Sequence, residues 1–126
     1  MNQSCQYSVA EASTVGVSTY ANVTQDNIAQ MKAAVAQQPT SVLIEADRAV
    51  FQQYRSGIFS STGCGTSLDH ATLVVGYGSE NGTEYWIMKN SWGTVWGEQG
   101  YMRLEIVDGA GICGIQMSPL YPTADN

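Results

Sequence analysis

The stretch Leu-Asp-His-Ala-Thr-Leu-Val-Val-Gly-Tyr-Gly (residues 68–78), followed by Tyr-Trp-Ile-Met-Lys-Asn-Ser-Trp-Gly-Thr-Val-Trp-Gly-Glu-Gln-Gly (residues 85–100), contains the only histidine and all three tryptophans of the chain. His70 opens an apolar, β-branched run, and a neutral imidazole held at a strand end can accept a proton near pH 7. Asn90 can fix the tautomer of such a ring by accepting the proton of one ring nitrogen. The ordinary alternatives are a structural histidine and a turn asparagine.

Taken together, the two segments closely resemble the histidine and asparagine regions of papain-like cysteine proteases of the cathepsin L-like kind. The resemblance extends over about residues 5–122. It implies that His70 pairs with a cysteine thiolate and later protonates the leaving amine, while Asn90 orients the imidazole ring. It also implies that Trp92 shields the His-Asn contact from water, which strengthens that hydrogen bond. Trp96 is expected only to pack.

The resemblance covers the second half of such a protease. In that family the nucleophile lies far upstream, in a Gln-x-x-x-Cys-Gly-Ser-Cys-Trp segment, and none of Cys5, Cys64 and Cys113 has this context. We therefore expect residues 1–126 to form a single domain, the C-terminal (right-hand) half of a cysteine-type endopeptidase without its nucleophile domain. A base without its nucleophile performs no acyl transfer, so the chain alone should be inactive.

Composition narrows the classes of partner. A chain of 126 residues with 44% apolar and 13% charged residues is typical of one globular domain with a real core. A net charge of −6, with only five Lys and Arg, argues against nucleic acid or an anionic membrane as a partner. We expect no cofactor, and a peptide or protein substrate only together with a complementary nucleophile-bearing domain. The resemblance implies a lysosomal, vacuolar or secreted parent protein, and N-glycosylation acceptor triplets begin at Asn2, Asn22 and Asn81.

The pattern of residues predicts more strands than helices. A helix is expected over residues 25–37, capped by Thr24, with Asp26 in its first turn and Ile28, Met31 and Val35 on its buried face. Asn81-Gly82 predicts a hairpin turn. Strands are expected at 14–20, 41–45, 73–77, 83–89 and 100–107, with a helical turn at 47–54 whose Phe51 and Tyr54 point inward and a final segment at 113–121. We predict an α+β, β-rich fold, the right-hand domain of the papain fold: an antiparallel half-barrel sheet with one packed helix.

By resemblance, several residues contribute to substrate binding. Leu43, Leu68 and Ala71 make the pocket for the second substrate side chain (P2) apolar, which predicts a preference for bulky hydrophobic P2 residues. Ser118, or less favourably Met117, forms its floor. Asp69 is also assigned to the substrate-binding set, although its side chain should point to the opposite face of the strand from His70.

The cysteines leave three interpretations open. By resemblance Cys64 and Cys113 form a disulfide, which the chain-entropy model values at about 4 kcal/mol for a loop of this length, and Cys5 is a free thiol. Two buried thiols are the simpler alternative. A zinc site from Cys64, His70 and Cys113 is a third, but the spacing is unlike usual zinc motifs and we expect no metal.

A stand-alone module without catalysis is the alternative function. Without a partner domain, the face carrying Leu43, Leu68, His70 and Trp92 would expose apolar surface of the kind that drives association. The chain would then form a homodimer or exchange segments through this face.

Overall fold

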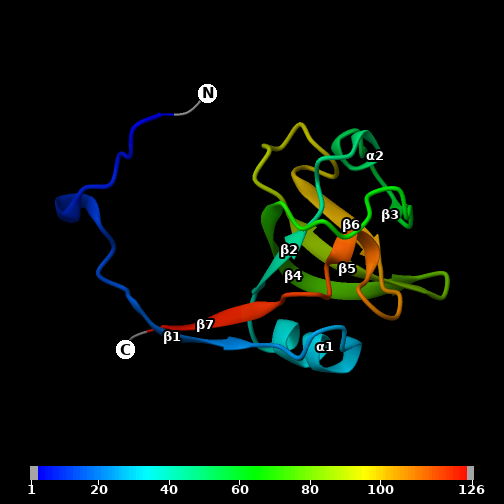
Figure 1. Cartoon of the computed structure of the whole chain (residues 1–126), viewed down its shortest axis with the longest axis horizontal. Helices are drawn as coiled ribbons and strands as arrows, with labels where there is room; N and C mark the ends of the chain where they lie inside the picture. The colour runs from blue at the N-terminus through cyan, green and yellow to red at the C-terminus, as the bar shows by residue number, and fades with distance from the viewer. Residues whose placement is uncertain (1–2, 125–126) are drawn as a thin grey trace.

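The structure, a computed structural model, describes residues 3–124. In Figure 1 these residues form a body built on one twisted sheet and an N-terminal arm, residues 3–16, that runs away from it. The strands are β1 (Val17–Asn22), β2 (Thr40–Ile44), β3 (Ile58–Phe59), β4 (His70–Glu80), β5 (Thr83–Lys89), β6 (Tyr101–Glu105) and β7 (Leu120–Ala124). The helices are α1 (Ile28–Gln37) and α2 (Ala49–Gln52), with 3-10 turns η1 (Val9–Glu11) and η2 (Ile112–Gly114). This sheet-rich mixture confirms the predicted α+β class.

The sheet has the strand order β1-β7-β2-β4-β5-β6-β3 within the described residues. The pairs are antiparallel except β3 with β6, which is parallel. β4 is longer than predicted, because its first half pairs with β2 and its second half with β5. The predicted hairpin turn is confirmed: Asn81 and Gly82 have φ of 52° and 82°, and Glu80 pairs with Thr83. The long hairpin returns the chain toward His70.

Helix α1 starts later than predicted. Its cap is Asn27, whose Oδ1 accepts the backbone N–H of Gln30 at 2.9 Å, so the expected cap at Thr24 is wrong. Asp26 lies before the helix with φ of 55°, because its N–H is held 2.8 Å from the carbonyl of Gln116. The predicted buried face is confirmed by Met31 and Val35, with Ile28 packed beside them. Among residues 3–124, no helix has the length and apolar character needed to cross a bilayer.

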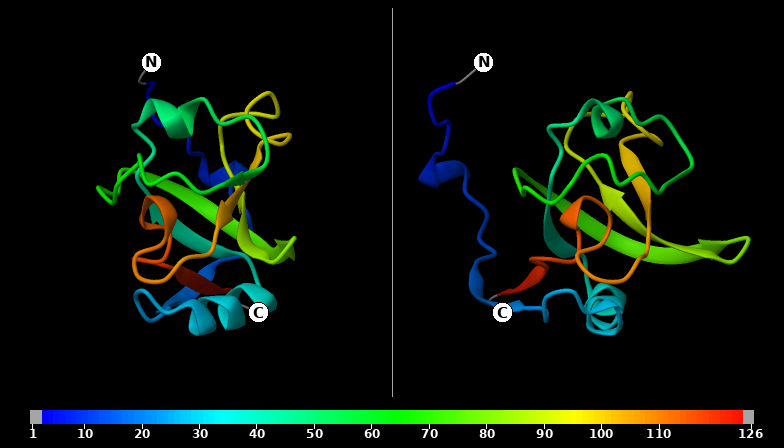
Figure 2. Two further views of the ribbon diagram at one scale, coloured as in Figure 1. Left: turned by 90° about the vertical axis from the view of Figure 1, so that its right-hand side faces the viewer. Right: turned by 45° about the vertical axis from the view of Figure 1, so that its right-hand side comes forward.

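The first and last strands of the sequence pair with each other. β1 pairs with β7 from Val17, opposite Ala124, to Asn22, opposite Leu120. The strand predicted at 14–20 is therefore displaced toward the C-terminus, since only residues from Val17 onward have a partner strand. Figure 2 shows the resulting ribbon at one edge of the body, close to α1, with the arm standing apart.

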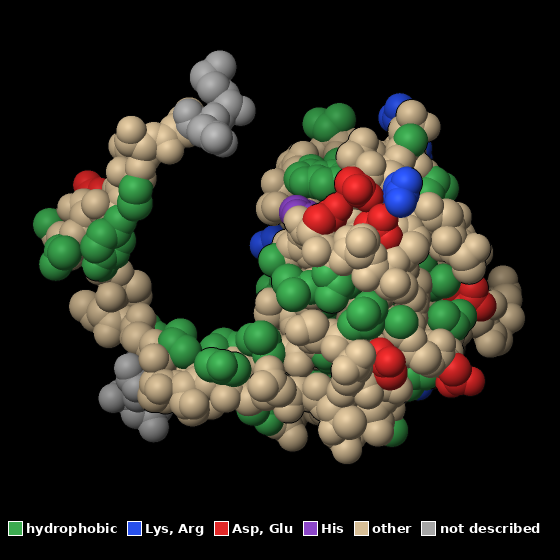
Figure 3. Space-filling model, in the orientation of Figure 1, with side chains coloured by type: hydrophobic (Ala, Val, Ile, Leu, Met, Phe, Trp, Pro, Cys, Tyr) green, Lys and Arg blue, Asp and Glu red, His purple; other side chains and the backbone are tan. Residues whose placement is uncertain are grey.

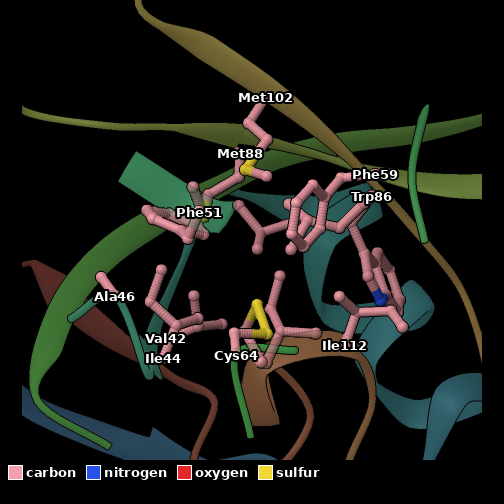
Figure 4. Close-up of a cluster of buried hydrophobic side chains, with 14 of the residues drawn as sticks. Val42, Ile44, Ala46, Phe51, Phe59, Cys64, Trp86, Met88, Met102 and Ile112 are labelled. Atoms are coloured by element: carbon pink, nitrogen blue, oxygen red, sulfur yellow. A yellow bond between two sulfur atoms is a disulfide. The ribbon is translucent and has the colours of Figure 1, made fainter. Parts of the chain in front are cut away.

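The core lies between the sheet and the connections that fold back over it. Figure 4 shows Phe51 of α2, Trp86 and Met88 of β5 and the disulfide of Cys64 around one buried cluster. Phe51 is fully buried and Tyr54 nearly so, as the sequence predicted. This core holds β4 and β5, which carry the site residues described next.

Candidate active site

His70 and Asn90 come together at the open end of the β4–β5 ribbon. His70 begins β4, where it pairs with Ile44 of β2, and Asn90 directly follows β5. The backbone N–H of Asn90 donates to the carbonyl of Gly100 at 3.0 Å, which fixes the end of the strand. His70 Nε2 then lies 2.9 Å from Asn90 Oδ1. The predicted contact is thus made by residues that are 20 positions apart.

The hydrogen bonds around Asn90 define the tautomer of the histidine. The backbone N–H of Ser91 donates to Asn90 Oδ1 at 2.7 Å, so this amide atom must be an acceptor. His70 Nε2 must therefore carry the proton in the neutral ring. The other ring nitrogen, Nδ1, is left to accept a proton from a reacting group.

Trp92 covers one face of the imidazole ring. The ring centroids of His70 and Trp92 are 5.2 Å apart with planes inclined by 28°, a stacked arrangement. Phe51 meets Trp92 edge-on at 5.5 Å, and Trp96 meets it edge-on at 5.2 Å. Trp96 also donates its indole N–H to the carbonyl of Gln52 at 3.0 Å, beyond the packing role that the sequence suggested. The cover over His70 is therefore itself fixed from two sides.

An ion pair holds the loop that carries these tryptophans. Arg103 of β6 contacts both carboxylate oxygens of Glu98, through Nε at 2.8 Å and Nη2 at 3.0 Å. This bidentate contact is the main reason that the pKa of Glu98 is lowered and that of Arg103 raised. The Tyr54 hydroxyl lies 2.6 Å from the carbonyl of Gly57 and 3.1 Å from Glu98 Oε1, and burial raises the pKa of Tyr54 to about 12.

Asp69 anchors the strand that presents His70. Its Oδ1 accepts the backbone N–H of Ala46 at 2.8 Å, and its own N–H donates to the carbonyl of Ile44 at 2.9 Å. The carboxylate therefore bonds the chain beyond β2, while the histidine next to it bonds Asn90. Substrate binding by Asp69 stays a prediction.

The residues assigned to the P2 pocket fall into two places. Leu43 and Ala71 pair directly across β2 and β4, on the exposed face of the sheet, and 37% of Leu43 is accessible to solvent. Leu68 lies beside Met117 across Gly114, whose φ is 75° and where an added Cβ would come within 2.8 Å of Leu68 Cδ2 and 3.0 Å of Met117 Sδ. The absence of a side chain at this glycine is what allows that approach.

Ser118 lies in a different hollow from Leu68. That hollow has a volume of about 530 Å³ and is lined by Asn22, Val23, Thr24, Gln25, Met117, Ser118 and Pro119. Met117 is thus the residue that contacts both regions, and the sequence-based preference for Ser118 as the pocket floor stays a prediction.

Glu45 is a supporting residue that the sequence analysis missed. It is 1% exposed, and its carboxylate accepts the N–H of Ser67 at 3.0 Å and Arg48 Nε at 3.1 Å. The Ser67 N–H is the largest cause of its lowered pKa. The available signal was a carboxylate inside an apolar strand. Glu45 thereby secures the loop that leads into His70.

The cysteines adopt the predicted pairing. Cys64 and Cys113 form a disulfide that closes a separation of 49 residues, and Cys5 is exposed and unpaired on the arm. Disulfide sulfurs are not thiolate ligands, so the zinc alternative loses two of its three ligands. Within residues 3–124 no three metal-ligating side chains, His70 included, come together as a group.

A family model described as "Papain family cysteine protease" matches residues 1–123. The chain belongs to the papain family. Oryzain beta chain of Oryza sativa subsp. japonica is 48% identical over 94% of this papain-family chain, and cysteine proteinase COT44 of Brassica napus is 46% identical over 96%. The chain spans only 26% and 37% of the lengths of these two proteins.

Solved structures show the same similarity. The bromelain protease from Ananas comosus, in complex with the E64 inhibitor, has a TM-score of 0.80 at 48% identity, covering 85% of this chain and 50% of that one. Digestive procathepsin L 3 of Tenebrio molitor larval midgut has a TM-score of 0.86 at 38% identity, covering 98% of this chain and 40% of that one. These comparisons favour a cysteine protease relationship over the stand-alone binding module.

Proposed function

We propose that this chain is the His/Asn-bearing half of a papain-like endopeptidase and hydrolyses peptide bonds only when a complementary domain supplies the thiolate. The observation that carries the proposal is the His70–Asn90 contact of 2.9 Å beneath a stacked Trp92. His70 Nδ1 is the free proton acceptor of this arrangement. Cys64 and Cys113 are consumed in the disulfide, and Cys5 belongs to the arm.

In the proposed reaction His70 Nδ1 accepts the proton of the incoming thiol. The thiolate attacks the substrate carbonyl carbon, and the imidazolium gives its proton to the departing amine as the peptide bond breaks. Water, deprotonated by the same nitrogen, then hydrolyses the thioester and regenerates the thiol. Asn90 holds the Nε2–H end throughout, and the Trp92 ring limits the access of water to that hydrogen bond.

We also propose that the P2 subsite is apolar. Leu43 and Ala71 form the pair next to His70 in the β2–β4 ladder, with Leu68 and Met117 packed around Gly114. None of these four side chains carries a carboxylate that could pair with a basic P2 side chain. Bulky hydrophobic P2 residues should therefore bind better than basic ones.

The test is reconstitution. The chain is mixed with a separately produced domain that carries a papain-type nucleophile, and hydrolysis of fluorogenic dipeptides with Phe, Leu or Arg at P2 is measured. We expect no turnover by either part alone and turnover by the mixture, abolished by His70→Ala and favouring Phe and Leu. Hydrolysis by the pure chain that is lost on alkylation of Cys5 would overturn the proposal.

The same face should also govern self-association. In the space-filling view of Figure 3, the one histidine reaches the surface on the side of the body that faces the arm, with apolar side chains below it. We propose that the isolated chain dimerises through this face, as Leu43 and Trp92 are both more than one-third exposed. Sedimentation should show a dimer that the complementary domain dissociates; a monomer at all concentrations would refute it.

For localisation, we propose a vacuolar, lysosomal or secreted parent protein. The disulfide of Cys64 and Cys113 is typical of an oxidising compartment. Oryzain beta chain and cysteine proteinase COT44, two of the relatives named above, are plant proteins. Fractionation of cells that express the parent protein, followed by immunoblotting, would test it: a cytosolic, reduced protein would contradict it.

A further inference from the structure

Two buried polar atoms near the site have no hydrogen-bond partner among the described residues. They are Thr72 Oγ1 and Asn90 Nδ2. Thr72 is 8% exposed and Asn90 is 7% exposed, so bulk water does not readily solvate either atom. Buried polar groups in folded proteins are almost always hydrogen-bonded, and an exception calls for an explanation.

The strand register brings these two residues to the same end of the β4–β5 ladder. The ladder ends with the pair of Leu73 and Lys89, and Thr72 and Asn90 are the next residues of the two segments beyond that pair. Side chains alternate along a strand, and Thr72 therefore lies on the same face of β4 as His70. Thr72 therefore lies two residues along β4 from His70, on the face from which His70 contacts Asn90.

The two ends of the Asn90 amide differ in their contacts. Oδ1 receives hydrogen bonds from Ser91 N–H at 2.7 Å and from His70 Nε2 at 2.9 Å. Nδ2 is a donor that needs an acceptor, and a threonine hydroxyl can accept. The two unpartnered atoms are therefore chemically complementary.

We infer that Thr72 is a positioning residue for Asn90, and that one bound water bridges Thr72 Oγ1 and Asn90 Nδ2. A single water can accept from the amide and donate to the hydroxyl, which satisfies both buried atoms. The importance of this bridge for catalysis rests on the proposed function. The existence of an ordered water that fixes the Asn90 amide does not depend on it.

The choice of threonine supports the role of the hydroxyl. The neighbours of Thr72 on the buried face are apolar: Val42 pairs with it across β2, and Val74 follows it on β4, both fully buried. Valine would fill nearly the same volume without burying a polar group. The hydroxyl is thus an energetic cost unless it is bonded.

The bridge has a direct consequence for His70. An Asn90 amide held at both ends cannot rotate to present Nδ2 to the ring, where it would meet the Nε2–H donor. Loss of the bridge leaves Ser91 N–H as the remaining restraint on the amide, and a rotated amide would favour the other tautomer, with the proton on Nδ1. That tautomer cannot accept a proton where the proposed reaction needs it.

The experiment compares Thr72→Val with Thr40→Val in the full chain. Thr40 is fully buried in β2, and its hydroxyl donates to the carbonyl of Gln38 at 3.3 Å, so it is a matched loss of one buried hydroxyl away from the site. NMR of the ring nitrogens reports the tautomer of His70, and exchange of the side-chain amide protons reports on Asn90. Thr72→Val should speed this exchange and populate the second tautomer, whereas Thr40→Val should change neither.

A rescue variant and a measurement on the unmodified chain complete the test. Thr72→Ser keeps the hydroxyl and should retain the original tautomer and slow exchange. In the unmodified chain the Asn90 side-chain amide protons should show cross-relaxation to a long-lived water. This measurement does not require any variant to fold. Loss of the bridge should reduce the folding equilibrium constant about threefold to tenfold. An unchanged tautomer and exchange rate in Thr72→Val, or no bound water, would overturn the inference.

These readouts use the chain without a nucleophile domain. Failure of the reconstituted protease would therefore count against the proposed function and leave the NMR results standing. Conversely, an active mixture with an unperturbed Thr72→Val variant would refute only the bridge.

Discussion

Replacing Gln116 with leucine removes a buried side chain that bonds three other groups. Gln116 is fully buried; its Nε2 donates to the carbonyls of Val107 at 2.9 Å and Gly109 at 2.8 Å, and its Oε1 accepts the indole N–H of Trp86 at 3.2 Å. Trp86 is also fully buried, so its stranded N–H should cost about 1–3 kcal/mol. Water can reach Gly109 and, in part, Val107, so these carbonyls should add about 1 kcal/mol. The expected loss of unfolding free energy is about 2–4 kcal/mol.

Urea denaturation followed by tryptophan fluorescence measures this loss, with Gln30→Leu on the exposed side of α1 as the control, expected to change stability by less than about 0.5 kcal/mol. A double-mutant cycle with Trp86→Phe isolates the single contact and should give a coupling of about 1 kcal/mol. If Gln116→Leu destabilises the protein no more than the control does, the hydrogen bonds of Gln116 to Trp86, Val107 and Gly109 do not stabilise the fold, and the reasoning fails.

Three further predictions concern charge and cross-linking. Because the Arg103 contact lowers the folded pKa of Glu98, the stability that Glu98 contributes is present above the ordinary carboxyl pKa near 4.5 and is lost as the pH falls through the folded pKa. Glu98→Gln should therefore reduce the fall of the urea midpoint between about pH 6 and 3. A variant whose midpoint depends on pH as steeply as that of the unmodified chain would contradict this. Because burial raises the folded pKa of Tyr54 to about 12, stability should fall as pH rises from 10 to 12, and Tyr54→Phe should remove part of that fall in alkaline unfolding curves. Replacing Cys64 and Cys113 together with alanine opens the loop of 49 residues and should cost about 4 kcal/mol in thermal or urea unfolding; a cost below about 1 kcal/mol would show that the unfolded chain is not restrained by the cross-link.

Local patterns predicted the parts of the fold that local physics determines. Asn81-Gly82 favours a tight hairpin on its own, and the spacing of Met31 and Val35 defines one helix face. The start of α1 was mispredicted, because both Thr24 and Asn27 are good caps. A long-range contact decides between them: the N–H of Asp26 bonds the carbonyl of Gln116, and Gln25 and Asp26 form a turn before the helix begins after Asn27.

The site residues likewise fall into those that a local motif identifies and those that only long-range packing brings into place. His70, Asn90 and Trp92 stand in a long motif and could be assigned from the sequence by resemblance. Phe51 supports Trp92 from a separate helix, and that contact depends on how α2 packs onto the loop after β5. Similarly, the placement of Thr72 and Asn90 just beyond the pair of Leu73 and Lys89 depends on the strand register, which no local pattern specifies.

The pairing of β1 with β7 sets the point where the arm joins the sheet beside the last described residue of the chain. Val17, where the arm leaves the sheet, is the register partner of Ala124, near the far end of the chain (Figure 1). A second domain joined at Val17, in place of the arm, or behind Ala124 would therefore start from nearly the same region. For engineering, this makes the order of two fused halves exchangeable: a circularly permuted version, with the complementary half tethered behind Ala124, needs a linker of similar reach.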